Sequence, residues 1–188
     1  MKYKICVSGA AETDKCAADA MENTKELGRE IVRQNGICVT GATKGAPLWA
    51  AIGATEEGGV SIGLSPASSE IDHVKAYKLP IEPFDIIIYT GFDYSGRNLL
   101  LTRSSDAVII TCGRMGTLNE FTIAFEDNKP IGVLTETGGT ADQLKEIVEN
   151  ANRGPGKVVY DPNPKTLLQK VIKLIDEEKA KAKPEKPY

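Results

Sequence analysis

The sequence lacks the features that mark several large classes of protein. It has no apolar run near the roughly 20 residues that a transmembrane helix needs. Its formal net charge of −3 argues against a surface that attracts nucleic acid. The apolar stretch at the N-terminus is too short for a signal peptide. We therefore expect a cytoplasmic protein that binds neither membrane nor nucleic acid.

Cysteine and histidine are scarce and poorly placed for a metal site. Only His73 accompanies the four cysteines, which are Cys6, Cys16, Cys38 and Cys112, and no two of them form a C-x-x-C pair. A zinc site therefore has no ligand set, and no metal or cofactor is expected. In a reducing compartment the cysteines are expected to be unpaired, buried, small side chains.

Two motifs that are common in nucleotide-binding proteins are also missing. No G-x-x-x-x-G-K-[ST] segment is present, and no G-x-G-x-x-G segment follows the first expected strand. These absences argue against a P-loop ATPase and against an ordinary dinucleotide-dependent oxidoreductase.

What the sequence does contain is a regular alternation of short β-type runs and longer amphipathic stretches. This alternation predicts an α/β fold, namely a single-domain, Rossmann-like, doubly wound and mainly parallel sheet of about seven strands with helices on both faces. The predicted domain spans 1–176, and a charged tail, expected to be disordered, follows over 177–188. Expected strands are 3–8, 37–40, 60–64, 85–89, 107–111, 131–134 and 157–160; expected helices are 17–32, 46–57, 97–105, 118–127, 144–151 and 167–175.

Glycine-bearing loops follow three of the expected strands, at 8–11, 40–47 and 112–120. In a doubly wound sheet the ligand crevice lies outside the carboxyl ends of the strands, so all three loops are expected at one edge. A single loop of this kind favours a simple turn. Three together favour a binding site, because glycine allows close backbone approach and helix N-termini attract phosphate. We predict a site for a mononucleotide-sized phosphate ester.

The residues around these loops carry a resemblance to a known family. Arg97-Asn98, the segment 105–110 and the run 113–120 are similar to the Lonely Guy phosphoribohydrolase family and its relatives, often labelled "possible lysine decarboxylase". The hallmark of that family is P-G-G-x-G-T-x-x-E with an arginine upstream. Further similar segments at 28–30, 40–45 and 53–63 extend the resemblance over most of residues 1–135.

The resemblance implies a Rossmann-like homo-oligomer, a dimer or a tetramer, that cleaves a nucleoside 5′-monophosphate into free base and ribose 5-phosphate. Other relatives only carry a ligand, as molybdenum cofactor carrier proteins do. Motif matching places Arg97 and Glu120 at the catalytic positions. The candidate ligand-binding residues are Ser8, Gly9, Gly41, Ala42, Lys44, Asn98, Gly113, Arg114, Met115, Gly116 and Thr117.

Two departures from the family pattern bear on activity. Cys112 and Arg114 replace the proline and the second glycine of the hallmark, and Ala42 replaces the second glycine of a usual Gly-Gly pair. Arg114 either adds a guanidinium to a phosphate site or fills the pocket and changes which ligand fits. Lys44 is either a surface charge or a second cation that faces phosphate.

Glu120 has two interpretations. A carboxylate beside the sugar would stabilise the positive charge that develops when the ribosyl C–N bond breaks. Thr117-x-x-Glu120 is also a capping box, in which the glutamate only caps a helix. Arg97 is expected to bind and stabilise electrostatically rather than to donate a proton. Its position at an expected helix start favours function, because a positive charge there opposes the helix dipole.

We therefore predict a nucleotide-binding protein that hydrolyses a nucleoside 5′-monophosphate, with a noncatalytic nucleotide or molybdenum-cofactor-like carrier as the alternative. A lysine decarboxylase is disfavoured, because no lysine stands in a context that would hold pyridoxal phosphate. His73 is expected to be exposed, and Leu48 and Trp49 are expected to be core or subunit contacts.

Overall fold

Seven parallel strands form one sheet in the order β4-β3-β2-β1-β5-β6-β7. The structure is a computed structural model that describes residues 1–181. The strands are β1 (Tyr3–Ser8), β2 (Gly36–Thr40), β3 (Ser61–Ser65), β4 (Ile86–Tyr89), β5 (Ala107–Ile110), β6 (Ile131–Leu134) and β7 (Val158–Asp161). Every expected strand is present, within one residue at each end, which confirms the predicted α/β fold.

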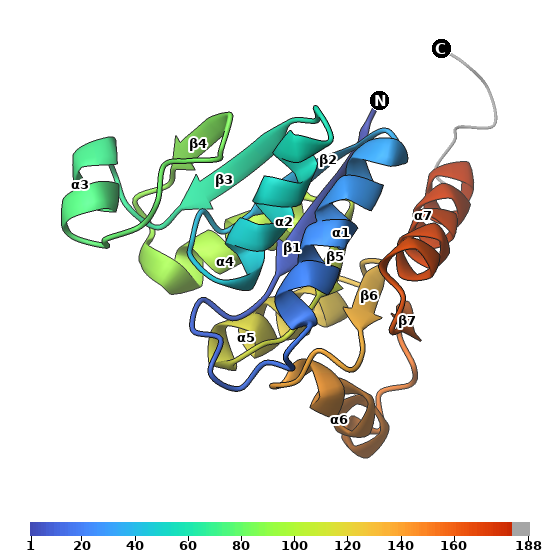
Figure 1. Cartoon of the computed structure of the whole chain (residues 1–188). Helices are drawn as coiled ribbons and strands as arrows, with labels where there is room; N and C mark the ends of the chain where they lie inside the picture. Colours follow the sequence, from blue (N-terminus) through green and yellow to red (C-terminus); the bar gives the residue numbers. More distant parts are fainter. Residues whose placement is uncertain (182–188) are drawn as a thin grey trace, which may run out of the picture.

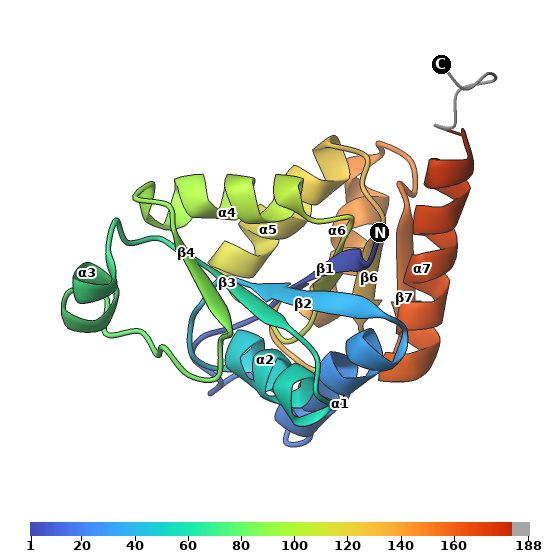
Figure 2. The same ribbon diagram turned by 90° about the horizontal axis from the view of Figure 1, so that it is seen from above.

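Helices cover both faces of the sheet, as Figures 1 and 2 show. One face carries α1 (Ala20–Arg33), α2 (Ala46–Glu56) and α7 (Pro164–Lys181). The other carries α4 (Asp93–Ser104), α5 (Met115–Glu126) and α6 (Leu144–Ala151), the last preceded by a short 3-10 turn, η1 (Ala141–Gln143). A small helix, α3 (Glu70–Lys75), lies beyond the β4 edge of the sheet.

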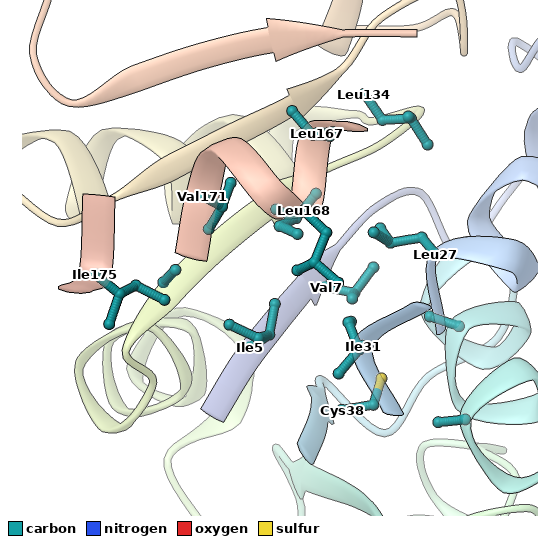
Figure 3. Packing of buried hydrophobic residues seen from close by; sticks show 14 residues of the cluster. Ile5, Val7, Leu27, Ile31, Cys38, Leu134, Leu167, Leu168, Val171 and Ile175 are labelled. Carbon is teal, nitrogen blue, oxygen red and sulfur yellow. The ribbon is translucent and has the colours of Figure 1, made fainter. Parts of the chain in front are cut away.

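The strands alternate their side chains between two apolar cores, because successive residues of a strand point to opposite faces. In β1, Ile5 and Val7 face the core under α1, α2 and α7, which Figure 3 shows. Cys6 belongs to the opposite core, under α4, α5 and α6. By the same alternation Ser8, the last residue of β1, continues on the α4 and α5 side.

Two glycines let α1 and α2 pack backbone against backbone. A Cβ atom at Gly28 would lie 2.0 Å from the carbonyl oxygen of Ala50, and one at Gly53 would lie 1.9 Å from that of Lys25. Neither position has room for a side chain. The pair fixes the two helices relative to each other, and with them the loops that lead into them from β1 and β2.

The strand order creates a switch point between β1 and β5. The chain first moves outward from β1 through β2 and β3 to β4, and then returns to place β5 on the other side of β1. Connections therefore leave β1 and β5 in opposite directions, which opens a crevice at their carboxyl ends.

His73 is buried, so the expectation that it is exposed is wrong. It lies in α3, where its Nδ1 is 2.8 Å from Ser65 Oγ and its Nε2 is 2.9 Å from the carbonyl oxygen of Pro80. These two polar partners satisfy the ring inside the protein. The surrounding sequence is polar because the other side of this short helix faces water.

The last helix continues beyond the predicted domain boundary. Residues 177–181 form the end of α7, although the sequence predicts a disordered tail from 177. Lys157 pairs with Glu178, and Lys179 Nζ lies 3.6 Å from Asp106 Oδ1 and 4.7 Å from the ring centre of Tyr3. These contacts hold the final turns against the amino end of the sheet. The rest of the predicted tail, 182–188, lies outside the described residues.

Within residues 1–181, no helix combines the length and apolar character needed to cross a membrane.

Candidate functional site

A cavity of about 220 Å³ opens at the carboxyl ends of β1, β2 and β5, where the three glycine-bearing loops meet. Its walls come from the loops after β1 and β2, from the first turns of α4 and from the start of α5. The lining residues are Val7, Ser8, Gly9, Ala10, Ala11, Glu12, Gly41, Thr43, Pro47, Tyr94, Arg97, Asn98, Arg114, Gly116, Thr117 and Glu120.

A buried ion pair lies at the base of this cavity. Arg97 and Glu120 are each only 5% exposed, and Arg97 Nη1 donates to Glu120 Oε1 over 3.2 Å. Ser8 Oγ donates to the other carboxylate oxygen, Oε2. A terminal atom of the Asn98 amide lies 3.0 Å from both Glu120 Oε1 and the carbonyl oxygen of Tyr94, and as the amide nitrogen it donates to both. The carboxylate is thus held by three donors.

Burial raises the pKa of the Glu120 carboxyl, and the Arg97 charge and the Ser8 hydrogen bond offset only part of that effect. Desolvation disfavours the charged form of an acid. A proton is therefore easier to place on Glu120 than on a surface glutamate. Perturbed carboxyls of this kind are concentrated at functional sites.

Arg97 keeps unused hydrogen-bonding capacity in the cavity wall. Its Nε is buried and has no partner within the described part of the chain. The guanidinium fits because position 41 has no side chain: a Cβ on Gly41 would lie 1.9 Å from Arg97 Nη1. The glycine after β2 therefore makes room for the arginine of α4.

The N-terminus of α5 also faces the cavity. Gly116 and Thr117, in its first turn, line the cavity, and their amides have no backbone partner among residues 1–181. No acidic residue occupies this turn, and no side chain caps it. Free amides and the positive end of the helix dipole make such a terminus attractive to an anion.

The start of α5 rules out the capping-box interpretation of Glu120. The helix begins at Met115, so Thr117 lies in its first turn and Glu120 one turn further along. The glutamate binds Ser8 and Arg97 rather than a backbone amide at the helix start. The expected start of the preceding helix at Arg97 is also wrong, because α4 begins at Asp93 and Arg97 lies in its second turn.

Four of the predicted ligand-binding residues do not line the cavity. Lys44 and Met115 are exposed, with Met115 75% accessible. Ala42 is fully buried and has a positive φ of 50°. Gly113 is tied to the loop after β6, where its carbonyl oxygen accepts the Thr140 amide over 2.8 Å. None of these four residues belongs to the cavity lining.

Arg114 lies at the rim and does not fill the cavity. Its side chain is 54% exposed, and its Nη1 is 4.0 Å from Asp14 Oδ1. The guanidinium can therefore reach an anion at the mouth of the cavity. Of the two expectations for this residue, the geometry supports an added cation.

Sequence reasoning missed several lining residues, above all Thr43, Pro47 and Tyr94. Thr43 stands in the loop after β2 and Pro47 in the first turn of α2, and neither is a charged residue or a glycine that would mark it in the sequence. Tyr94 precedes the expected helix start, although it lies in the first turn of α4. The signal that marks the true start is Asp93, whose Oδ1 accepts the Tyr94 amide over 2.9 Å.

Cys16 and Cys112 form a disulfide, so the expectation of four unpaired cysteines is wrong for these two. Cys6 and Cys38 are free and buried, as predicted. The residues of the pair are 96 positions apart in sequence. They meet because β1 and β5 are neighbours, which places the loop after β1 beside the end of β5. The disulfide thus closes the loop that supplies Ala10, Ala11 and Glu12 to the cavity.

The chain is similar to proteins of known sequence and structure over most of its length. An uncharacterized protein from Archaeoglobus fulgidus is 28% identical over 131 residues, which span 70% of this chain and 79% of that protein. The molybdenum cofactor binding protein from the phototrophic bacterium Rippkaea orientalis is 26% identical, with a TM-score of 0.73, and the match covers 95% of this chain and 98% of that chain. The molybdenum cofactor carrier protein from Chlamydomonas reinhardtii is 25% identical, with a TM-score of 0.74 and coverage of 94% and 99%.

A family model assigns the chain more directly. The model of the SLOG cluster4 family matches residues 2–168, which includes every strand and every cavity-lining residue. The narrower assignment to the Lonely Guy enzymes stays a prediction. The chain belongs to the SLOG cluster4 family.

Proposed function

We propose that this protein binds and carries a phosphate-bearing small molecule of the nucleotide or pterin type. One observation carries the proposal: the guanidinium-bearing Arg97 and the uncapped amides of Gly116 and Thr117 line the same cavity. A guanidinium and the free amides at a helix start both attract an anion. Arg114 supplies a further cation at the rim.

The hydrogen bonds of Glu120 favour a protein that carries its ligand over one that cleaves it. Its carboxylate already accepts from Ser8, Arg97 and Asn98, and its charge is compensated by Arg97. The pair presents a nearly neutral, hydrogen-bonded wall to a ligand. A carboxylate that stabilises a developing positive charge would need to be less fully engaged.

The similar structures support the same proposal. Two proteins that match almost the full chain are named as a molybdenum cofactor binding protein and a molybdenum cofactor carrier protein. If this chain shares that property, the cofactor is its cargo, and the phosphate of the cofactor would lie at Arg97 and the start of α5.

Hydrolysis of a nucleoside 5′-monophosphate is the second candidate. The observation that favours it is the position of Glu120, whose carboxyl group lies in the cavity wall. With phosphate at the start of α5, remote binding energy would orient the anomeric carbon, and Glu120 would stabilise the positive charge on the sugar. The reaction would release free base and ribose 5-phosphate.

Substitution Glu120→Gln separates the two candidates. We expect wild-type protein to bind AMP, GMP or a phosphorylated pterin in calorimetric titrations, without release of base from the nucleotides in chromatography. Glu120→Gln should bind the same ligand about tenfold more tightly, because the Arg97 charge is no longer compensated; a tenfold change corresponds to roughly 1.4 kcal/mol.

The control is Glu12→Gln, which removes an exposed carboxylate at the same cavity. Solvent screens this charge, so the affinity should change little. If the wild-type protein releases free base and Glu120→Gln does not, the proposed function is hydrolysis instead of carriage. Failure of all three ligands to bind the folded wild-type protein would overturn both candidates.

A further inference from the structure

We propose that Tyr94 is the platform on which a planar ring of the ligand stacks, which makes this residue the determinant that selects ring-bearing ligands over bare sugar phosphates. The inference rests on the proposed function, because it concerns the same cavity. It concerns the ring of the ligand, which the anion-binding groups do not contact.

Tyr94 presents an aromatic surface at the side of the cavity. It lines the cavity and is 46% exposed, whereas Arg97 and Glu120 at the base are nearly inaccessible. The guanidinium carbon of Arg97 lies 5.9 Å from the centre of the Tyr94 ring. A ligand held by Arg97 is therefore within reach of the ring.

The size of the cavity also places part of the ligand at its mouth. A volume of about 220 Å³ is below the roughly 300–1,000 Å³ that is usual for small-molecule pockets. A phosphate and its sugar can occupy the enclosed part. A base or pterin attached to them then extends toward the mouth, where the accessible aromatic side chain lies.

The ring is held in place before any ligand binds. The Tyr77 ring packs edge-on against it, with ring centres 5.6 Å apart and planes at 74°. Tyr77 also donates its hydroxyl to Asp93 Oδ1 over 3.3 Å, and the same oxygen accepts the Tyr94 amide. Asp93 itself adopts a positive φ of 54°, which sets the direction of the first turn of α4. A fixed ring loses little entropy when it stacks on a ligand.

Base stacking on an aromatic side chain contributes enough to be measured. Removing such a ring weakens binding by about tenfold or more per base, and the contribution tolerates different bases because every base has a π face. The nearby Arg97 charge adds a cation–π contact to the same ring. The chemical class selected is thus a phosphate ester that bears a flat, aromatic heterocycle.

The test compares AMP with ribose 5-phosphate, which has the same phosphate and sugar but no ring. In calorimetric titrations, Tyr94→Leu should weaken the binding of AMP by about tenfold or more. The affinity for ribose 5-phosphate should stay within twofold of the wild-type value. Tyr94→Phe, which keeps the ring, should retain the AMP affinity. Phe92→Leu is the matched control, because this neighbouring aromatic residue is 66% exposed but does not line the cavity.

Three results would overturn the inference. The first is unchanged AMP affinity in Tyr94→Leu, and the second is an equal loss for both ligands, which would indicate a structural role. The third is failure of Tyr94→Phe to retain binding, which would assign the effect to the hydroxyl. Each of these leaves the proposed function standing. If folded wild-type protein binds none of AMP, GMP and the phosphorylated pterin, the proposed function fails together with the inference.

Discussion

Gly41 shows how a missing side chain can define a binding site. The buried guanidinium of Arg97 occupies the space where any other residue at position 41 would place its Cβ. From that position Arg97 donates to Glu120 and lines the cavity. The loop after β2 thus contributes to the site through the room it leaves, and not through a functional group.

Substitution Gly41→Ala should therefore displace Arg97 and disrupt the ion pair. We expect a loss of about 1–3 kcal/mol in the free energy of unfolding, the usual cost of overpacking a buried site. AMP binding should weaken by at least tenfold, measured by calorimetry alongside thermal unfolding.

Gly116→Ala provides the contrast, because a Cβ at Gly116 meets no atom within 4 Å. Alanine in this helical turn should raise the stability by about 0.5 kcal/mol. If Gly41→Ala has the same melting temperature and the same AMP affinity as the wild type, Arg97 is more mobile than its packing indicates.

At the residue scale, the sequence identifies the charged residues of the cavity better than their surroundings. Arg97 and Glu120 follow from the motif, and the structure brings them together. The bond from Ser8 to Glu120 could not be predicted, because it depends on the strand order that sets β1 beside β5. Lys44, in the loop after β2, and Met115, the first residue of α5, stand in the right segments, but a position in the sequence does not reveal where a side chain points.

The helices that frame the site begin earlier than their sequences indicate. The residues that precede α4 and α5 are Phe92 and Arg114, and neither caps its helix with a side chain. Serine, threonine, aspartate and asparagine are the usual sequence signals for a helix start. Neither helix has one of these residues at its cap position, so periodicity locates the middle of the helix and misses its first turn, which is where Tyr94 and Gly116 lie.

The loop between β1 and α1 is held at both ends. Its Ala10 amide donates to the Cys112 carbonyl over 2.6 Å, and its Ala17 amide donates to Thr137 over 3.0 Å. The bond between Cys16 and Cys112 also joins the loop to the segment that follows β5. The loop supplies one wall of the cavity, so its anchoring affects ligand binding as well as stability.

Reduction of the disulfide should therefore lower both properties. We expect the free energy of unfolding to fall by roughly 2–4 kcal/mol, because the bond closes a long loop in the unfolded chain. AMP affinity should fall as well, since the loop 9–19 becomes more mobile. Thermal unfolding and calorimetry with and without reductant measure the two effects.

Cys16→Ser serves as the control, because it should match the reduced protein and no longer respond to reductant. A thiol assay on denatured protein checks the chemistry: two free thiols are expected before reduction, from Cys6 and Cys38, and four after it. If the oxidised protein, with two free thiols, and the reduced protein, with four, melt at the same temperature, the disulfide does not stabilise the fold.

At the scale of the whole molecule, the fold class and nearly every strand boundary can be predicted from the sequence. Hydrophobic runs such as Val108-Ile109-Ile110 are typical of buried parallel strands. The disulfide could not be predicted, because it joins segments that come together only in the complete sheet. The burial of His73 could not be predicted either, because its partners Ser65 and Pro80 lie outside α3.

One end of the sheet keeps an apolar surface that the described residues leave uncovered. Ile86 and Ile88 of β4 are each 49% exposed, and they pair in register with Ile62 and Leu64, which face the α4 side. On the same side, Leu99 and Leu100 of α4 are 37% and 40% exposed. Several exposed apolar side chains on one side of a sheet edge are typical of an interface. We expect a second copy of the chain to cover this one, in keeping with the homo-oligomer that the sequence resemblance implies.

Ile88→Asp should break such an assembly. Light scattering after size-exclusion chromatography should give the mass of a dimer or tetramer for the wild type and of a single chain for the variant, because a charge would be buried without a partner. Val60→Asp changes an exposed valine that precedes β3 and should leave the mass unchanged. A wild-type protein with the mass of one chain would contradict the expectation.

The parallel sheet gives the molecule two unlike ends. All seven strands begin at the edge where α7 finishes beside Tyr3, and they point toward the cavity at the other edge. Met1 and Lys181 therefore both lie remote from the ligand-binding mouth, as Figure 1 shows for the start of the chain and the end of α7. A fluorophore, a surface tether or a fused domain attached at Met1 or at Lys181 would leave the mouth open, so immobilised protein should capture ligand as freely as protein in solution.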